Sequence, residues 1–356
     1  MIDKVPPLMS QISHDTRIMR LLPRLTSRQP AMSRIQRLFP VAHLLYRAIG
    51  RPAHELRWLL QSEEQIDAWV DRRLQLGEDY WLFVLGLNNS GTTLLTRILE
   101  SHPRMRTLPH EGQWLTPALP HPPTHGAART WSNRADIFHW TEQHDPTPAR
   151  RIRYDWARYY PQRPGILLEK SPPNTLRSRW LQANFVPSRF VGLVRHPYAL
   201  CEGARRRLKA NILDTARHWN DGIRILLEDA AHLDAILLIR YEDLTHQPNS
   251  TMTSIESFLG FEPGSLSPER FVDIRASYIR DESGPLRNMN ASSFARLDRE
   301  ERIQIATICG ELMERLGYAT DPDPHNETSA GVIPGRAPRG RGWLDTTSGQ
   351  QIETSD

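Results

Sequence analysis

A loop between two glycines is the first place in this sequence where residue types and spacing indicate chemistry. In "GLNNSGTTLL", Gly86 ends an apolar run, and Gly91 precedes two threonines that open a helical pattern. Backbone amides from Asn88 to Thr93 would then point into one concavity at the positive end of a helix dipole, where an anion is favoured. The threonine hydroxyls add donors. The loop is therefore predicted to hold a phosphate-like group.

The loop lacks the lysine that nucleoside-triphosphate loops carry. Those loops have the pattern G-x-x-x-x-G-K-[ST], in which the lysine reaches the outer phosphates and the hydroxyl holds magnesium. Here Thr92 stands at the lysine position. Ordinary ATPase or kinase chemistry is therefore not expected at this loop. Taken alone, the stretch is also compatible with a connection whose glycines serve only turn geometry.

The segments around the loop alternate in a way that indicates a parallel sheet. Short apolar runs suited to buried strands lie at 81–87, 165–170, 189–195 and 235–241. Longer helical patterns lie between or after them, at 91–101, 173–184, 198–210, 214–232, 249–259 and 298–316. Strands without interior polar residues that are joined by helices are typical of an α/β protein with a mostly parallel central sheet flanked by helices.

Composition divides the chain into three parts. Residues 1–75 hold arginine-rich helical patterns broken by prolines, which predict a helical basic N-terminal region, and residues 78–319 form the α/β domain. Inside that domain, residues 104–164 are irregular and rich in proline and aromatic residues. Loops of this length in a compact fold are more often functional than not, although a disordered insertion is the alternative. The segment 320–356 is poor in apolar residues, so it is predicted to be disordered.

Charge and cysteine content narrow the class of protein. The formal net charge is +4, and no nucleic-acid partner is expected. Arginines crowd the first fifty residues, where a solvated helical face and a contact with a membrane surface or a polyanion both stay open. Two cysteines are too few for a disulfide framework, and neither a signal peptide nor an apolar run of ~20 residues is visible. We therefore expect a cytoplasmic protein.

Several motifs in order resemble those of sulfotransferases that use 3′-phosphoadenosine 5′-phosphosulfate (PAPS). The S-G-T-T of the loop resembles their 5′-phosphosulfate loop, and "LLEKSPPN" (167–174) resembles a segment of heparan and tyrosylprotein sulfotransferases. "VGLVRHPYAL" (191–200) is similar to their 3′-phosphate strand, and "LLIRYEDL" (237–244) to their R-Y-E-D-L strand. Residues 296–318 resemble the closing helix of bacterial members. The resemblance, over about residues 80 to 318, implies a P-loop-like sulfotransferase fold.

The resemblance implies how the nucleotide would be held. Arg195 would bind the 3′-phosphate, a task that suits the paired donors of a guanidinium, although a surface arginine at a strand end is the alternative. Eight residues later, where the family adds a serine contact to this phosphate, the sequence has Gly203. The 5′-phosphosulfate would be held by Ser90, Gly91, Thr92 and Thr93.

The arginines that follow Gly203 have two interpretations. They either compensate for the missing serine or form a basic helix face; they are Arg205, Arg206 and Arg207.

The resemblance also implies the catalytic groups. Lys170 matches the lysine that approaches the transferring sulfuryl group, where an ammonium can stabilise negative charge on the leaving oxygen; a structural ion pair is the alternative. Glu111, in "TLPHEGQWL", matches the glutamate that takes the acceptor proton. His110 is the second candidate for this base, because its unperturbed pKa of ~6.5 suits the role. Both are also compatible with ordinary loop positions.

The sequence departs from the family at Asn89, where relatives place a basic residue that assists departure of the leaving group. Asparagine still donates hydrogen bonds but brings no charge. Arg287, in the loop before the closing helix, is a further phosphate candidate. Glu242 and Asp243 in "RYEDL" are predicted to be structural, capping a helix or pairing with Arg240.

The resemblance implies transfer of a sulfuryl group from PAPS, as co-substrate, to a hydroxyl or an amine of a carbohydrate, peptide or small-molecule acceptor. No metal is expected, because fixed amides and cations can accommodate a monoanionic sulfuryl group where a triphosphate requires magnesium. Two alternatives stay open. One is a phosphonucleotide-binding protein without turnover, and the other is a P-loop kinase of unusual sequence.

Overall fold

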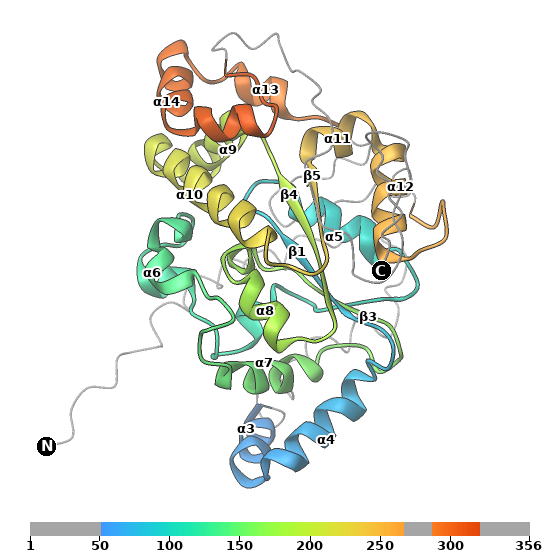
Figure 1. Cartoon of the computed structure of the whole chain (residues 1–356). Helices are drawn as coiled ribbons and strands as arrows, with labels where there is room; N and C mark the ends of the chain where they lie inside the picture. The colour runs from blue at the N-terminus through green and yellow to red at the C-terminus, as the bar shows by residue number, and fades with distance from the viewer. Residues whose placement is uncertain (1–50, 267–286, 321–356) are drawn as a thin grey trace, which may run out of the picture. The chain divides into compact units, whose positions relative to one another are not determined.

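The computed structural model describes residues 51–266 and 287–320 (Figure 1). The predicted disordered tail, from residue 321 onward, and the arginine-rich stretch within residues 1–50 lie outside the described residues. Contacts divide the chain into two units, Met1–Glu63 and Glu64–Asp356. In the first unit, helix α3 (Arg51–Leu60) exposes Leu56, Leu59 and Leu60.

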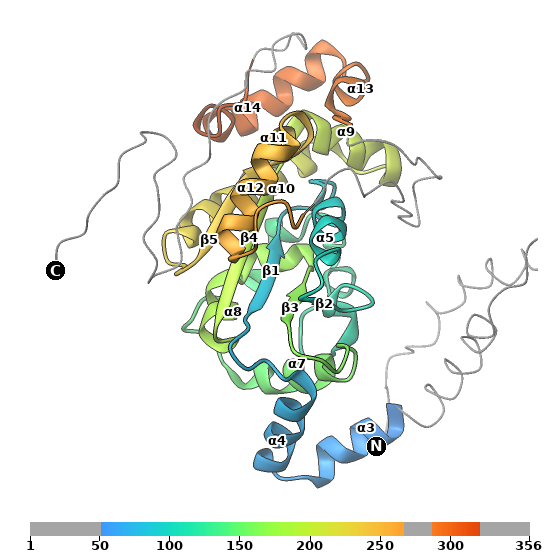
Figure 2. The ribbon, with the colours of Figure 1, turned by 90° about the vertical axis from the view of Figure 1, so that its right-hand side faces the viewer.

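The second unit contains a five-stranded sheet in which every pairing is parallel. Its strand order is β2-β3-β1-β4-β5, as Figure 2 shows in the reverse direction. The strands are β1 (Trp81–Leu85), β2 (Met105–Thr107), β3 (Ile166–Glu169), β4 (Ser188–Val194) and β5 (Ile236–Arg240). The predicted fold class, an α/β protein with a mostly parallel central sheet, is confirmed.

The strand order places a switch point between β1 and β4. From β1 the chain runs to β2 and β3 on one side of the sheet, and it then returns past β1 to β4 and β5 on the other side. In open parallel sheets, ligands bind at the carboxyl ends of the strands where the direction of winding changes. The glycine loop follows β1 and Arg195 follows β4, so both lie at this place.

An aliphatic layer covers one face of the sheet. Leu82 and Val84 of β1 point to this face and pack with side chains of α5 (Thr92–Glu100) and α12 (Pro248–Leu259). Figure 1 shows both helices on the same side of the sheet. Burial of this apolar surface places the start of α5 over the end of β1.

An aromatic layer covers the other face, because alternate residues of a strand point to opposite faces. Trp81 and Phe83 contact Phe185 edge to face, at ring-centroid distances of 5.0 and 5.6 Å. Trp156 lies 6.0 Å from Trp81. The helices on this side are α7 (Thr147–Ala157), α8 (Ser178–Asn184) and α10 (Ile212–Ala230).

The predicted strands agree with the structure, but the segment 104–164 is more regular than predicted. It contains β2, helix α7 and a short helix, α6 (Ala135–Phe138), with 3-10 turns η4 (Gly112–Leu115), η5 (Pro122–His125) and η6 (Trp131–Arg134). Strand β2 has only three residues, and Arg106 interrupts its apolar character. Arg106 is buried and donates to the carbonyl oxygens of Pro161 and Leu74. Tertiary contacts therefore stabilise a strand that the local pattern does not predict.

Helix α4 (Glu63–Leu74) packs with the α/β unit, whereas the predicted α/β domain begins at residue 78. Its last turn is fixed by Arg73, which donates to the carbonyl oxygens of Ala157 and Arg158 at 3.3 and 3.0 Å.

The predicted helix 173–184 divides into the 3-10 turn η7 (Pro172–Leu176) and α8. Within residues 51–266 and 287–320, no helix is both long and apolar enough to cross a membrane.

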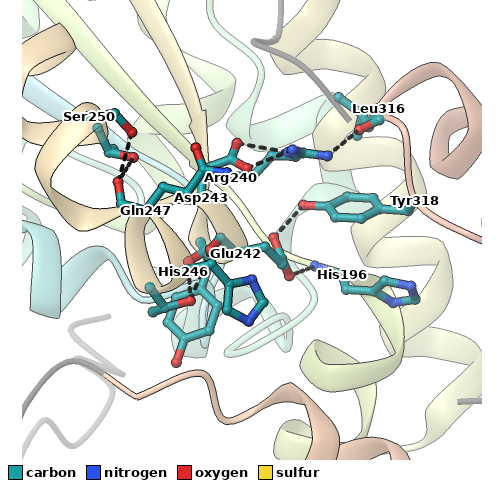
Figure 3. Close-up of polar contacts among 12 residues, drawn as sticks. His196, Arg240, Glu242, Asp243, His246, Gln247, Ser250, Leu316 and Tyr318 are labelled. Carbon is teal, nitrogen blue, oxygen red and sulfur yellow. Dashed lines mark hydrogen bonds and ion pairs between the residues drawn. The ribbon is translucent and has the colours of Figure 1, made fainter. Parts of the chain in front are cut away.

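Glu242 joins the last part of the chain to the sheet (Figure 3). It lies in α11 (Tyr241–His246), which follows β5, and accepts hydrogen bonds from His196 N (3.1 Å), Asn290 Nδ2 (2.6 Å) and Tyr318 Oη (2.9 Å). The neighbouring Asp243 pairs with Arg240, as the sequence predicted. The elements joined are α9 (Pro197–Leu208), α13 (Asn290–Phe294) and the segment after α14 (Arg299–Arg315).

We expect Glu242→Gln to lower the free energy of unfolding by roughly 1–3 kcal/mol. The NH2 group of glutamine cannot accept a hydrogen bond, so at least one of the donors that Glu242 now satisfies would lose its acceptor. Urea unfolding measures the change. Glu311→Gln is the matched control, since the side chain of Glu311 is 77% exposed and its ion pair with Arg224 is 3.6 Å long. The control is expected to stay within about 0.5 kcal/mol of the unchanged protein. Equal losses in both variants would contradict the structural role of Glu242.

Candidate active site

The glycine loop runs closely over β4 and over Tyr241. A Cβ atom at Gly86 would lie 2.6 Å from the carbonyl oxygen of Leu193, and one at Gly91 would lie 2.8 Å from the Tyr241 ring. Both glycines also have positive φ, 143° and 96°, a region that other residues rarely adopt. Asn89, at φ 69°, is the residue type that best tolerates the left-handed conformation after glycine. The loop conformation therefore explains why these positions are glycine and asparagine.

The loop presents donors that suit an anion. The first intrahelical bond of α5 joins Leu95 N to Gly91 O, which leaves the amides of Gly91, Thr92 and Thr93 at the helix start for another acceptor, whereas the Ser90 amide donates to Leu87 O at 3.1 Å. Ser90 is 1% exposed, and its hydroxyl has no hydrogen-bond partner among the described residues. Thr92 is buried and Thr93 is exposed. A buried hydroxyl without a partner is costly unless a ligand uses it, so the loop fits a phosphate or sulfate group.

Arg195 is fixed against the loop from the end of β4. Its Nη1 donates to the carbonyl oxygen of Asn89 at 2.9 Å, and its guanidinium lies 4.2 Å from the centroid of the Tyr241 ring. Its Nε donates to Asn290 Oδ1 at 2.9 Å, and Asn290 in turn donates to Glu242. The cation predicted for the 3′-phosphate is therefore held beside the phosphate loop by two neighbouring elements.

The other nucleotide candidates lie around the same loop. Gly203, in α9, is next to Asn89: a Cβ atom there would be 4.0 Å from the Cβ of Asn89. Arg287 is exposed, and its carbonyl oxygen accepts from the Tyr241 hydroxyl at 3.0 Å. Asn88, in the loop itself, accepts from the indole of Trp131 at 2.9 Å. The structure brings these residues together, and their roles toward a nucleotide stay predictions.

Lys170 and Glu111 form an ion pair, with 2.6 Å between Nζ and Oε1. Lys170 directly follows β3, and Glu111 caps the 3-10 turn η4. The other carboxylate oxygen of Glu111 accepts from Gln113 Nε2 at 2.8 Å and from the indole of Trp114 at 3.3 Å. The pair joins the two residues predicted as catalytic, and it is also the contact that a structural role of Lys170 requires. His110 is exposed beside Glu111.

This ion pair is connected to the phosphate loop through η7. The amide of Gly86 donates to the hydroxyl of Thr175 at 2.8 Å. Because η7 begins directly after Ser171, this bond fixes the Lys170 segment relative to the first residue of the loop. The glycine loop and the segment that carries Lys170 are therefore linked directly, and their use of one ligand stays a prediction.

The buried carboxylate of Glu169 is the part of the site that the sequence analysis missed. Glu169 ends β3 and accepts from Gly112 N at 2.8 Å, from Ser171 Oγ at 2.5 Å and from Asn174 Nδ2. Ser171 Oγ also accepts from Gln113 N at 3.1 Å. These bonds fix the turn that carries Glu111 to the segment that carries Lys170. An acidic residue at the end of the apolar run "ILLE" was the available signal.

The carboxylate of Glu169 is closely packed, and its pKa is higher than that of an exposed glutamate. A Cβ atom at Gly112 would lie 2.8 Å from Glu169 Oε1 and 2.7 Å from the Trp156 ring, so only glycine allows this approach. Burial raises the pKa of Glu169 from 4.5 to about 7, although the bonds from Ser171 and Gly112 oppose the rise. The nearby charge of Glu111 raises this pKa further, and that of Lys170 lowers it.

Three of the tryptophans between residues 114 and 180 differ in exposure. Trp131 and Trp156 are buried, at 1% and 0% exposure, and belong to the core. Trp114 is 49% exposed and lies next to Glu111. Only Trp114 among these three offers an indole face near the predicted base. Among the residues that the structure describes, no group of three or more His, Cys, Asp or Glu side chains forms a metal-ion site.

A glycine loop at the switch point of a parallel sheet is the arrangement with which α/β proteins commonly hold phosphorylated ligands. Within this class, the chain belongs to the sulfotransferase family, because the sequence model of that family matches residues 82–263. The resemblance on which the sequence analysis relied is thereby confirmed. The site sits on the fold that the family uses for group transfer. No match to a curated protein was found.

Solved structures with some similarity are also sulfotransferases. The sulfotransferase domain from the curacin biosynthetic pathway is 19% identical, with coverage of 68% of this chain and 98% of that chain and a TM-score of 0.44. Sulfotransferase STF9 from Mycobacterium avium is 14% identical, with coverage of 72% and 82% and a TM-score of 0.43. Mouse sulfotransferase SULT7A1, complexed with PAP, is 14% identical, with coverage of 72% and 90% and a TM-score of 0.39.

We expect stability to fall as pH rises from about 4.5 to about 7, because the folded protein keeps a proton on Glu169 that the unfolded chain has released. Above that range both states are ionised and the contribution is constant. Glu169→Gln removes the titrating group, so its free energy of unfolding should lack this slope. Urea unfolding at closely spaced pH values measures it. Glu100→Gln, which changes a surface pair with Arg97, is the control that should keep the slope.

Proposed function

We propose that this chain transfers a sulfuryl group from PAPS to a hydroxyl group of its acceptor. The observation that carries this proposal is the Lys170–Glu111 ion pair beside a loop that offers donors to an anion. PAPS, when bound, supplies the activated sulfuryl group. The remaining chemistry, which is binding, charge stabilisation and proton transfer, falls to side chains of this chain.

The nucleotide would be held at two places. The amides of Gly91, Thr92 and Thr93, with the buried Ser90 hydroxyl, suit the 5′-phosphosulfate, because the start of a nine-residue helix favours an anion. Arg195 suits the 3′-phosphate, since it is already oriented by Asn89 and Asn290. A guanidinium whose position is fixed before binding loses little conformational freedom when the ligand arrives.

Lys170 and Glu111 have complementary tasks at the acceptor. The ammonium of Lys170 would stabilise negative charge that develops on the leaving oxygen. Glu111 would accept the proton from the acceptor hydroxyl. Their ion pair, with 2.6 Å between Nζ and Oε1, holds the two groups side by side, so both can act on one acceptor.

The acceptor would meet the exposed face of Trp114 near Glu111. An indole provides a flat apolar surface with one hydrogen-bond donor, and sugar rings, peptide side chains and small metabolites can all pack on it. The proposal is therefore a hydroxyl acceptor of carbohydrate, peptide or small-molecule type. An amine acceptor would use the same base.

The test of the proposal is transfer of sulfate to a panel of such acceptors with PAPS, detected as the mass gain of one sulfuryl group. We expect Glu111→Gln and Lys170→Ala each to lower turnover by about 10²–10³-fold, because each removes one positioned catalytic group. His110→Gln is the matched control and should retain most activity. Loss of activity in His110→Gln with full activity in Glu111→Gln would assign the base to His110. Full activity in Lys170→Ala would show that Lys170 has only a structural role, as the partner of Glu111 in the ion pair.

Asn89 favours a second candidate function, that of a phosphonucleotide-binding protein without turnover, because this position carries no positive charge. We expect Asn89→Lys to raise turnover by about 10-fold or more, since it adds a cation beside the leaving group. Asn89→Ala is the control for loss of the amide alone. If the chain binds adenosine 3′,5′-bisphosphate but forms no product on any acceptor, with or without Asn89→Lys, the second candidate is correct.

A further inference from the structure

Two family contacts are missing on the side of the phosphate loop that faces α9. Position 89 has no positive charge, and position 203 has no side chain, yet the two positions are neighbours in space. Arg195 donates to the carbonyl oxygen of the same Asn89. The place where a serine and a basic residue would help to hold the nucleotide is therefore lined by Arg195, Asn89 and a glycine.

The next helical turn carries an arginine on the same face. Residues four apart on a helix lie one above the other, so Arg207 follows Gly203 along the face of α9 that is turned to the loop. The residues whose charges act on Arg207 include Arg195 and Tyr241, the two side chains that stack beside the loop. Arg207 is exposed, and its flexible stem spans the length of a helical turn.

The neighbouring arginines of α9 already have partners. Arg205 is paired with Glu301 and also donates to the carbonyl oxygen of Arg296 at 2.8 Å. Arg206 is paired with Glu202 at 2.8 Å. Arg207 has no hydrogen bond or ion pair with any residue in 51–266 or 287–320. Of the three candidates that the sequence left open, only Arg207 is available to an anion.

The surroundings of Arg207 carry an excess of positive charge. Partial burial lowers the pKa of its guanidinium, and the like charges of Arg206 and Arg195 lower it further, against the weaker opposing effect of Glu202. The positive charges of Arg195, Arg206 and Arg207 are therefore only partly offset by Glu202, and an excess of positive charge favours binding of an anion.

We propose that Arg207 contacts the 3′-phosphate of the nucleotide together with Arg195, in place of the serine that Gly203 lacks. This inference rests on the proposed function, since it concerns the nucleotide of that reaction. Two guanidinium groups can bind one phosphate dianion from two sides through charge-assisted hydrogen bonds. Arg207, one helical turn after Gly203, would thus replace the serine that the family has at position 203.

Isothermal titration calorimetry with two nucleotides tests the proposal. The probes are adenosine 3′,5′-bisphosphate, which has the 3′-phosphate, and adenosine 5′-monophosphate, which lacks it. We expect Arg207→Gln to weaken binding of the bisphosphate by about 10-fold or more and to leave binding of the monophosphate unchanged. Arg206→Gln is the matched control, because it removes an arginine from the same turn that is already paired with Glu202. It should change neither affinity.

A rescue variant separates this role from a general effect of charge. A Cβ atom at Gly203 meets nothing closer than 4.0 Å, so Gly203→Ser fits without strain. Added to Arg207→Gln, it should recover part of the lost affinity for the bisphosphate. Unchanged affinity in Arg207→Gln, or an equal loss for both nucleotides, would overturn the inference while leaving the proposed function intact. If the unchanged protein binds neither nucleotide, the proposed function fails and this inference fails with it.

Discussion

The hydrogen bond from Arg195 to the carbonyl oxygen of Asn89 joins the ends of β1 and β4, and the site is arranged around it. It requires a loop that runs directly over β4, which is why Gly86 and Gly91 have no side chains. It also requires a guanidinium with a fixed direction, which Asn290 and Glu242 provide. The segment after β5 and α13 therefore orient Arg195, the residue proposed to hold the 3′-phosphate, through a chain of hydrogen bonds.

The pair Lys170–Glu111, proposed to act on the acceptor, depends on a second arrangement, in which a buried carboxylate holds a turn in place. Glu169 is fully buried, yet it accepts a backbone amide and two side-chain donors, which offset the cost of removing it from water. The turn that it holds carries Glu111, and the next residue after Glu169 is Lys170. One carboxylate thus sets the distance between the proposed base and the proposed cation, and only a glycine at 112 leaves room for it.

Much of the fold and part of the site could be predicted from local patterns. The strands 81–85, 166–169, 188–194 and 236–240 each contain a run of consecutive apolar residues, which is visible in the sequence. Strand β2 and helix α7 were missed, because a three-residue strand with an arginine in it has no periodic signal. The partners of Arg205, Arg206 and Arg207 could not be predicted either, since three consecutive arginines look alike until the helix packs against acidic residues.

The sequence by itself determined the parallel sheet, the phosphate loop and the sulfotransferase resemblance, because each depends on residues that are close together along the chain. Only the tertiary structure decided which side chains meet. It paired Lys170 with Glu111 at the ends of β3 and β2, placed Gly203 against Asn89, and buried Glu169 against the turn that begins at Gly112. These contacts join residues far apart in sequence, and their geometry follows from packing of the whole domain rather than from any local preference.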